Sequence, residues 1–404
     1  MFFSIKENVY LVNGFKDACL YDLNKGDLFS INACAKNTIE RLCEENNAID
    51  SLKNSEKELV HELLSKGLII PSNTKAKQHD ILSLKQSYPI TFAWIDVTTV
   101  CNLKCVFCYE NASTSGRFMS MEDFKYAVDQ LTDLGIKRIQ ITGGEPMLLN
   151  EKLKEMILYC HNKFSFLEVY SNGTLITKEW SRFFKENNVS VAISLHSCDS
   201  SRHDSITKIS GSHDKTLKAI ECLKDSEVDL RINGVITFIN SEDQEQLKIL
   251  HNVKKTDPVR LTGKGNISLY DFELFKKKVI TKKSFQNKIS KNLISKNLTG
   301  QRCFLEKLYV ATNLDVYPCV MERRICYGNL REKKFDQLIQ HSMRFLSKDN
   351  IQTCKDCEYR YACLDCRPDA NGSDLDQKPW YCLYDPYIAN WENIRLAYKK
   401  RNRS

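Results

Sequence analysis

The sequence predicts an α/β fold: a partial (β/α)6 TIM-like barrel with a small winged-helix-like α+β domain before it and a cysteine-rich domain after it. Between residues 89 and 265, short apolar runs alternate with helical patterns, which predicts parallel strands joined by right-handed crossovers. Eight of the 17 cysteines lie from Cys303 to Cys382. A chain of 404 residues is also too long for one ordinary core, so two or three domains are expected.

Residues 1–72 form the first predicted domain. A strand pattern at 8–12 and a hairpin pattern at 18–31 precede helical patterns at 33–43 and 55–66, the second closed by Gly67. A three-stranded sheet backed by helices resembles the peptide-recognition domain of ribosomal peptide maturation systems. That resemblance implies capture of a leader peptide by strand addition at a sheet edge. A generic α+β module and a DNA-binding winged helix stay open as alternatives.

The barrel is predicted for residues 89–265, after a polar linker at 73–88 and before a bridging segment at 266–300. Ser120 and Asp123 indicate a capped helix start. The expected strands are 91–97, 137–142, 167–170, 191–195, 229–239 and a weaker one at 259–262, and the later expected helices are 152–160, 179–186 and 215–224.

Three cysteines follow the first barrel strand on one short loop. Cys101, Cys105 and Cys108 are separated by three and two residues. Three thiolates can hold three irons of a cubane cluster and leave the fourth iron open, unlike the four-cysteine sites that close a cluster. The open iron is the functional point, because a molecule other than protein can bind there.

Two turns, Gly143 to Pro146 and Ser171 to Thr174, follow the next two predicted strands. In a parallel barrel the carboxyl ends of the strands share one rim, so these turns lie at the same end as the cysteine loop. Gly143 and Gly144 let backbone approach a ligand closely. The remaining expected ligand contacts are Glu145 for an ammonium group, Ser171, Asn172 and Ser194 for a carboxylate or ribose hydroxyls, and Phe107 for stacking on a purine. Each feature alone has a structural explanation, but their order on one rim indicates a site for an amino acid joined to a nucleoside.

These motifs resemble the radical S-adenosylmethionine (SAM) superfamily over residues 90–265: Cys101, Cys105 and Cys108 with Phe107, then Gly143 to Pro146, then Ser171 to Thr174. The resemblance implies a [4Fe-4S] cluster with SAM chelated on its open iron. One electron then cleaves SAM to methionine and a 5′-deoxyadenosyl radical, which abstracts a hydrogen atom from the substrate. The family also carries a cation for the SAM carboxylate, and Lys208 is the candidate here.

The last predicted domain, residues 301–404, contains paired Cys-x-x-Cys knuckles, which also suit two zinc sites. Beside a radical SAM barrel it resembles the SPASM domain, which implies two auxiliary [4Fe-4S] clusters and therefore three clusters in all. Carried over, the family's ligation gives auxiliary cluster I Cys303, Cys319 and Cys366, and auxiliary cluster II Cys354, Cys357, Cys363 and Cys382.

The chain departs from the SPASM pattern at three points. Leu314 stands where the family has glycine, and two residues rather than three separate Cys363 from Cys366. Cluster I also lacks an upstream fourth cysteine. Either Cys326 completes the cluster or the site is open to a substrate thiol or water.

Composition narrows the function classes. The formal charge of +8 arises partly from eight lysines between Lys276 and Lys296, a run with one aromatic residue, Phe285, which disfavours a nucleic-acid surface. Neither a signal peptide nor a membrane span is predicted, so we expect a cytoplasmic protein without membrane partners. In a reducing compartment, clusters explain the cysteine count better than disulfides.

The resemblance implies a radical SAM oxidoreductase that modifies a ribosomally made precursor peptide, ending in a thioether or carbon–carbon crosslink. An electron donor such as a flavodoxin or ferredoxin is the second expected partner. A sulfatase-maturase-like enzyme is an alternative, although Val320 replaces the acidic residue that follows the second SPASM-region cysteine in that group. A metal-cluster DNA-binding regulator is the alternative from another class.

Overall fold

The computed structural model describes residues 2–46, 48–75, 79–253, 255–370 and 375–402. Its contacts divide the chain into two compact units. Unit 1 contains residues 1–88, 279–302 and 345–397, and unit 2 contains residues 89–278, 303–344 and 398–404. The stretch 301–404, which the sequence treats as one domain, is thus distributed over both units.

Unit 2 is built on a nine-stranded sheet in the order β11-β10-β9-β8-β7-β6-β12-β13-β14. The strands from β6 to β11 pair in parallel, β12 pairs in parallel with β6, and β13 and β14 add antiparallel. The strands are β6 (Phe92–Asp96), β7 (Arg138–Thr142), β8 (Phe166–Ser171), β9 (Ser190–Ser194), β10 (Leu230–Ile236), β11 (Lys255–Pro258), β12 (Lys307–Val310), β13 (Asp315–Tyr317) and β14 (Gly328–Asn329). The six consecutive parallel strands β6 to β11 confirm the predicted partial barrel, and β12 adds a seventh parallel strand.

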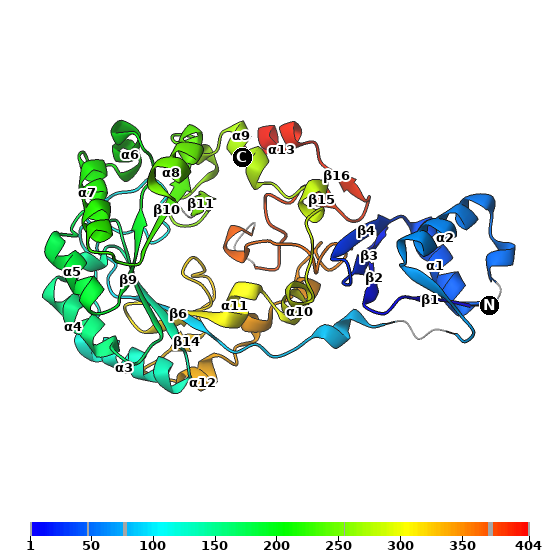
Figure 1. The fold of residues 1–404 in the computed structure, drawn as a ribbon, viewed down its shortest axis with the longest axis horizontal. Helices are drawn as coiled ribbons and strands as arrows, with labels where there is room; N and C mark the ends of the chain where they lie inside the picture. Colours follow the sequence, from blue (N-terminus) through cyan, green and yellow to red (C-terminus); the bar gives the residue numbers. More distant parts are fainter. Residues whose placement is uncertain (1, 47, 76–78, 254, 371–374, 403–404) are drawn as a thin grey trace. The chain divides into compact units, whose positions relative to one another are not determined.

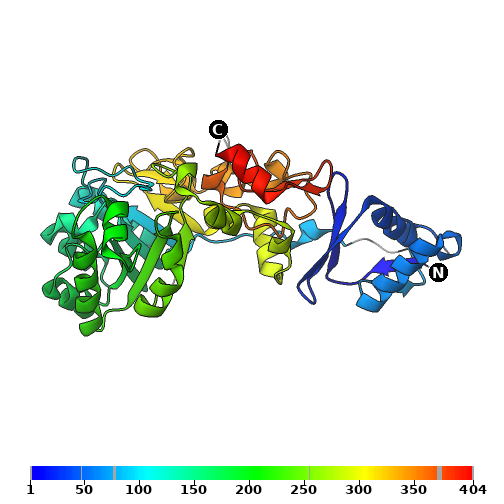
Figure 2. The ribbon, with the colours of Figure 1, turned by 90° about the horizontal axis from the view of Figure 1, so that it is seen from above.

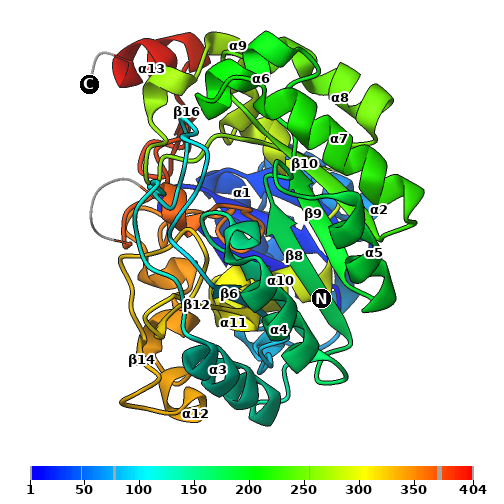
Figure 3. The same cartoon turned by 90° about the vertical axis from the view of Figure 1, so that its left-hand side faces the viewer.

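Helices alternate with these strands and cover the outer face of the sheet (Figure 3). They are α3 (Met121–Asp133), α4 (Glu151–Cys160), α5 (Lys178–Glu186), α6 (Ser200–Thr207), α7 (Ser212–Asp225), α8 (Gln244–His251), α9 (Phe272–Lys278) and α12 (Phe335–Leu338). The predicted cap of α3 is present, since the N–H of Asp123 donates to Ser120 Oγ at 3.0 Å. Two more helices, α11 (Arg302–Glu306) and α13 (Ile394–Arg401), contain residues of both units.

Two barrel elements differ from the sequence prediction. The last strand was expected at 259–262 but lies at Lys255–Pro258, where it pairs with residues 233–236 of β10. The apolar residues Val259 and Leu261 favoured the later position, whereas the sheet edge accepts the more polar segment. Helix α6 was not expected, because its sequence is polar. It begins at a cap in which Asp199 accepts the N–H of Arg202.

Unit 1 contains the predicted N-terminal elements. The three-stranded antiparallel sheet is β2 (Val9–Asn13), β3 (Ala18–Asp22) and β4 (Asp27–Ile31), and β1 (Phe2–Ile5) pairs with β5 (Ile69–Ser72). Helices α1 (Ala33–Glu44) and α2 (Asn54–Lys66) lie on one side of the three-stranded sheet (Figures 1 and 2). As predicted, Gly67 closes α2, with a left-handed φ of 69°.

The remaining part of unit 1 has little regular structure. It contains α10 (Lys291–Thr299), β15 (Tyr384–Asp385) and β16 (Asn390–Trp391), with short 3-10 turns between them. The four cysteines predicted for auxiliary cluster II lie in this part.

Candidate active site

The three-cysteine loop follows β6 and is held by backbone hydrogen bonds from three other segments. Cys101 N–H donates to the carbonyl of Ser113 at 2.8 Å. The N–H groups of Lys104 and Val106 donate to the last carbonyls of α6, Thr207 and Ile206, at 2.9 and 3.0 Å. The carbonyl of Cys108 accepts the N–H of Lys264 at 2.9 Å. The protein backbone therefore fixes the loop by itself.

The three thiols gather in one small cluster, in which buried Cys101 packs with partly buried Cys105 and Cys108. Burial, together with the neighbouring Cys108 and Cys101 thiols, raises the pKa of Cys105 to about 12. Burial likewise raises the pKa of Cys101 to about 11. A site of this kind accumulates negative charge when its thiols ionise, so it fits a cationic group that compensates that charge. Among the described residues no three Cys, His, Asp or Glu side chains are arranged to hold a single metal ion.

Gly143 and Gly144 bring the next turn against the entrance of the cysteine loop. A Cβ on Gly144 would lie 2.2 Å from the carbonyl oxygen of Val100, and one on Gly143 would lie 2.3 Å from that of Thr98. Gly143 also has a φ of 141°. The close approach that these glycines permit is therefore to the protein's own backbone, where Gly144 and Glu145 donate to Thr98 and Val100.

Glu145 joins this turn to the following one. Its carboxylate is fully buried and accepts from Met147 N–H at 3.0 Å, Ser171 Oγ at 2.7 Å and Asn172 N–H at 2.7 Å. Burial raises the pKa of Glu145 to about 7, and these three donors oppose the shift. The sequence assigned Glu145 to a ligand ammonium group, and in the protein it also locks two loops of the rim together.

Asn172 connects the second turn to the cysteine loop. Its amide Nδ2 donates to Asn102 Oδ1 at 2.9 Å and lies 3.9 Å from Cys101 Sγ, while its Oδ1 accepts from the backbone and hydroxyl of Thr174. Asn102 in turn donates to Thr174 Oγ1 at 2.8 Å. The predicted rim therefore exists as one hydrogen-bonded network that begins beside a cysteine.

Phe107, the predicted stacking residue, packs edge-on against His196, with ring centroids 4.9 Å apart. His196 stacks on His203, which contacts His213, so three buried histidines continue from the loop. Burial lowers the pKa of His196 to about 3 and that of His203 to about 4, so both are neutral. Sequence reasoning missed this row, since its members belong to three different segments.

The other two predicted SAM contacts are less tightly held. Ser194 is half-buried at the end of β9. Lys208 is exposed and ends α6 in the left-handed region, with a φ of 60°. It follows Thr207, whose carbonyl supports the cysteine loop.

A second buried cluster, unforeseen from sequence, lies beyond Cys108. Arg323 pairs with Glu110 at 2.6 Å and stacks over the ring of Tyr309 at 3.7 Å. Tyr309 donates to Asp96 Oδ2 at 2.7 Å, at the end of β6. Burial and, to a smaller extent, the nearby Glu110 carboxylate raise the pKa of Asp96 to about 8. Arg323 thereby joins the cysteine loop to the segment between Cys319 and Cys326.

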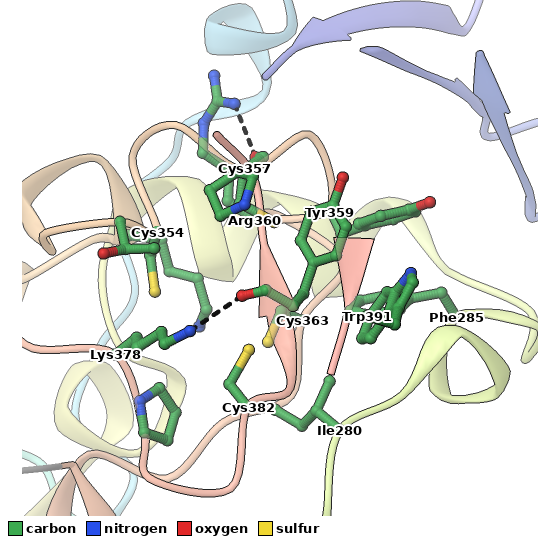
Figure 4. A pocket seen from close by; sticks show the side chains of 15 residues that line it. Ile280, Phe285, Cys354, Cys357, Tyr359, Arg360, Cys363, Lys378, Cys382 and Trp391 are labelled. Atoms are coloured by element: carbon green, nitrogen blue, oxygen red, sulfur yellow. Dashed lines mark hydrogen bonds between the residues drawn. The ribbon is translucent and has the colours of Figure 1, made fainter. Parts of the chain in front are cut away.

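The predicted cluster II cysteines share one cavity in unit 1. The cavity is lined by Cys354, Cys357, Cys363 and Cys382, together with Tyr359, Tyr384, Phe285 and Trp391. The sulfurs of Cys354, Cys363 and Cys382 turn toward a common space (Figure 4). The cavity and its four thiols fit a bound polynuclear group.

A buried charge triad supports this segment. Asp365 is fully buried and pairs with both Lys348 and Arg367, which are buried as well. Burial acts to raise the pKa of Asp365, but the two cations outweigh it and lower that pKa to about 2. Sequence reasoning did not find the triad, because Lys348 lies far from Asp365 in the chain and Arg367 is one of several charged residues near it.

The predicted cluster I cysteines fall in different units. Cys303, Cys319 and Cys326 belong to unit 2, and Cys366 belongs to unit 1. Leu314, which replaces the family's glycine, has a φ of 68° while its side chain is buried. The backbone thus keeps the conformation that glycine favours.

Comparisons with known proteins agree with this site. Residues 95–253 match the family model of the radical SAM superfamily. The subtilosin biosynthesis protein AlbA of Bacillus subtilis is 34% identical over 175 residues, which cover 42% of this chain and 39% of AlbA. The AdoMet-dependent heme synthase of Nitratidesulfovibrio vulgaris is 24% identical over 350 residues, covering 73% of this chain and 92% of that protein. This chain therefore spans well under half of AlbA.

Solved structures show the same fold. Streptococcus suis SuiB, bound to its precursor peptide SuiA, has a TM-score of 0.54 and 16% identity over 91% of this chain and 96% of SuiB. The anSMEcpe enzyme, with AdoMet and the Cp18Cys peptide, has a TM-score of 0.55 and 18% identity over 78% of this chain and 97% of that one. Among the described residues, none of the helices is long and apolar enough to cross a membrane. Residues 95–253 are therefore a radical SAM domain, whose cofactors are SAM and a [4Fe-4S] cluster.

Proposed function

We propose that this protein is a radical SAM oxidoreductase that modifies a ribosomally synthesised peptide by oxidative crosslinking, through a thioether or carbon–carbon bond. The observation that carries the proposal is the rim network that runs from Cys101 through Asn172 to Glu145. When bound, the cluster and SAM supply a 5′-deoxyadenosyl radical for hydrogen abstraction.

In this proposal Cys101, Cys105 and Cys108 hold the cluster. The turn Gly143 to Glu145 and the pair Ser171 and Asn172 orient SAM, and Phe107, Ser194 and Lys208 complete its site. Glu145 keeps the two turns at a fixed spacing, because its buried carboxylate accepts hydrogen bonds from both. Preorganised loops of this kind keep the cofactor's reactive atom in place and exclude water.

Two auxiliary clusters are part of the proposal. Cys354, Cys357, Cys363 and Cys382 hold cluster II, supported by their shared cavity. Cys303, Cys319 and Cys366 hold cluster I, with Cys326 as its candidate fourth ligand. Four thiols that line one cavity support a bound cluster at this place.

The proposed peptide partner binds unit 1 at β4. Among the described residues β4 has one strand neighbour, β3, so its other edge can pair with an extended peptide. An open groove of about 410 Å³ lies at β4, lined by residues of β4, α1 and α2 such as Phe29, Ile31 and Leu63. Glu62, Lys66 and Lys282 also line the groove, and Lys66 forms an ion pair with Glu62. AlbA is named for bacteriocin biosynthesis and SuiB was solved with a precursor peptide, which supports this partner.

The electron for SAM cleavage comes, in this proposal, from a flavodoxin or ferredoxin in the cytoplasm. The test is anaerobic reconstitution followed by incubation with SAM, reductant and synthetic peptides encoded by short reading frames beside the gene. A peptide that loses two hydrogens in mass spectrometry, with 5′-deoxyadenosine formed in step, supports the proposal. If SAM is cleaved but no peptide is modified, the peptide assignment is wrong. If SAM is not cleaved, the assignment as a radical SAM enzyme is wrong.

A further inference from the structure

The sheet that borders the peptide groove has two buried faces. On one face Leu20 and Phe29 pack with α1 and α2. On the other, Cys19 and Tyr21 pack with Tyr359 and Tyr384, which line the four-cysteine cavity. Alternation along β3 sends Leu20 to one side and Cys19 and Tyr21 to the other, as a strand buried on both faces requires. The sheet is therefore a middle layer, covered by helices on one side and by the cysteine-rich segment on the other.

Hydrogen bonds join the sheet to the residues around Cys357. The hydroxyl of Tyr21 donates to the carbonyl of Glu358 at 2.9 Å, and Arg360 Nη1 donates to the carbonyl of Asn13 at 2.7 Å. In the β2–β3 turn, Phe15 N–H donates to the carbonyl of Asp356 at 2.8 Å.

The β2–β3 turn also fits tightly against this segment. A Cβ on Gly14 would lie 2.8 Å from Glu358 Oε2 and 2.9 Å from Glu358 N. The turn and the cysteine segment are thus complementary surfaces, and neither can move far without the other.

Leu28 of β4 belongs to both sites. It is among the residues that line the peptide groove, and it packs against the residues of the four-cysteine face. The groove wall and the cysteine cavity are therefore separated by a single layer of sheet.

The segment that covers this face has little hydrogen-bonded structure of its own. Between residues 345 and 393 its only strands, β15 and β16, are two residues each, and the described remainder is short 3-10 turns and loops. Loops with little regular structure are stabilised by cross-links between distant residues. Thiolates that bind one common group form such cross-links.

We infer that a loaded Cys354/Cys357/Cys363/Cys382 site holds the β2–β4 sheet in its groove-forming conformation, so that peptide capture depends on a cluster that the peptide does not touch. The assignment of the groove to a peptide rests on the proposed function. The coupling between the cysteine site and the sheet rests on the contacts within unit 1. Its consequence is that enzyme lacking the auxiliary cluster does not retain the precursor.

The test is hydrogen–deuterium exchange of the full chain, read by mass spectrometry on the segment of residues 18–31. Loaded enzyme is compared with enzyme stripped of iron by an anaerobic chelator and with the same sample reloaded with iron and sulfide. Stripping is expected to speed exchange of this segment at least about tenfold, because its covering layer loosens, and reloading restores protection. Residues 151–160 of α4 serve as an internal control in the barrel and change less than about twofold.

Matched variants assign the effect to one site. Cys354→Ser with Cys357→Ser is expected to speed exchange of residues 18–31 about as much as stripping does, and Cys101→Ser with Cys105→Ser leaves it within about twofold of wild type. Equal exchange in loaded and stripped wild type would overturn the inference, as would an equal effect of both variant pairs. If Cys354→Ser with Cys357→Ser also speeds exchange of residues 151–160, the variant has lost structure in the barrel as well. The comparison of loaded, stripped and reloaded wild type then tests the inference without it. Failure of the peptide assignment would appear as absent peptide modification with this exchange pattern intact.

Discussion

Cys101, Cys105 and Cys108 follow a strand of a nine-stranded sheet, whereas Cys354, Cys357, Cys363 and Cys382 lie among loops whose strands are two residues long. The first loop is held by backbone hydrogen bonds to α6 and to two neighbouring segments. The second set is held by side chains, namely a buried charge triad and the face of a small sheet. The three-cysteine loop is thus held by backbone bonds within its own unit, whereas the four-cysteine segment and the small sheet are held to each other by side chains.

The largest expected effect is at the scaffolded site. Replacing Cys101, Cys105 and Cys108 together with alanine is expected to lower SAM cleavage at least about a thousandfold, because the cofactor carries the chemistry and loses its ligands. Thermal unfolding followed by circular dichroism is expected to stay close to wild type, since backbone bonds hold the loop. A collapse of the barrel in this variant would contradict the scaffold.

The triad at the auxiliary site gives the next largest effect. Asp365→Asn leaves the buried Lys348 and Arg367 without their counter-charge, which is expected to cost about 3–5 kcal/mol in the free energy of unfolding. Because the folded-state pKa of Asp365 is lowered to about 2, its stabilisation is present above its usual pKa and disappears as the pH falls through 2. Chemical denaturation at several pH values measures both effects. Glu245→Gln, which breaks the exposed pair with Lys248, is the control and changes nothing measurable.

Two single glycine-to-alanine variants, compared with each other, test the close packing of the rim. Gly144→Ala places a Cβ 2.2 Å from the Val100 carbonyl oxygen, so the cysteine loop must shift. We expect the free energy of unfolding to fall by about 3 kcal/mol and most of the SAM cleavage to be lost. Gly135→Ala meets no atom within 4 Å and suffers only its left-handed φ of 80°, about 1 kcal/mol, with cleavage retained. Equal losses in the two variants would show that the close packing of Gly144 is unimportant.

The smallest effect is expected at Lys208. Lys208→Gln removes one charge-assisted hydrogen bond to the SAM carboxylate, so the KM for SAM rises about tenfold with little change in kcat. Lys215→Gln, an exposed lysine on α7, is the matched control. An unchanged KM in Lys208→Gln would remove this residue from the SAM site.

Local patterns account for what could be predicted. Apolar periodicity placed β6 to β10, and the capping pattern at Ser120 placed the start of α3, because both signals are local to the chain. The same reasoning misplaced β11, where apolar residues follow the strand rather than form it. It also missed α6, whose polar sequence hides the cap at Asp199.

Long-range contacts account for what could not. Cysteine spacing identified the four thiols of the shared cavity, yet nothing near Cys357 in sequence indicates that Tyr21 packs beside it. Arg323 and Glu110 are 213 residues apart, so no local pattern joins them. The role of Glu145 as a link between turns likewise depends on Asn172, which only the folded barrel brings near.

The central claim is that two different cysteine sets serve two different purposes, and SAM cleavage measures it most directly. Reconstituted wild type, the Cys101/Cys105/Cys108 alanine variant and a Cys354→Ala/Cys357→Ala variant are each incubated anaerobically with SAM and dithionite, and 5′-deoxyadenosine is quantified with the bound iron. The account predicts about twelve irons in wild type and about eight in each variant, by the four-iron count of each cluster. It also predicts release of 5′-deoxyadenosine by wild type and by the Cys354/Cys357 variant alone. Release by the triple variant, or bound zinc with no release by wild type, would contradict it.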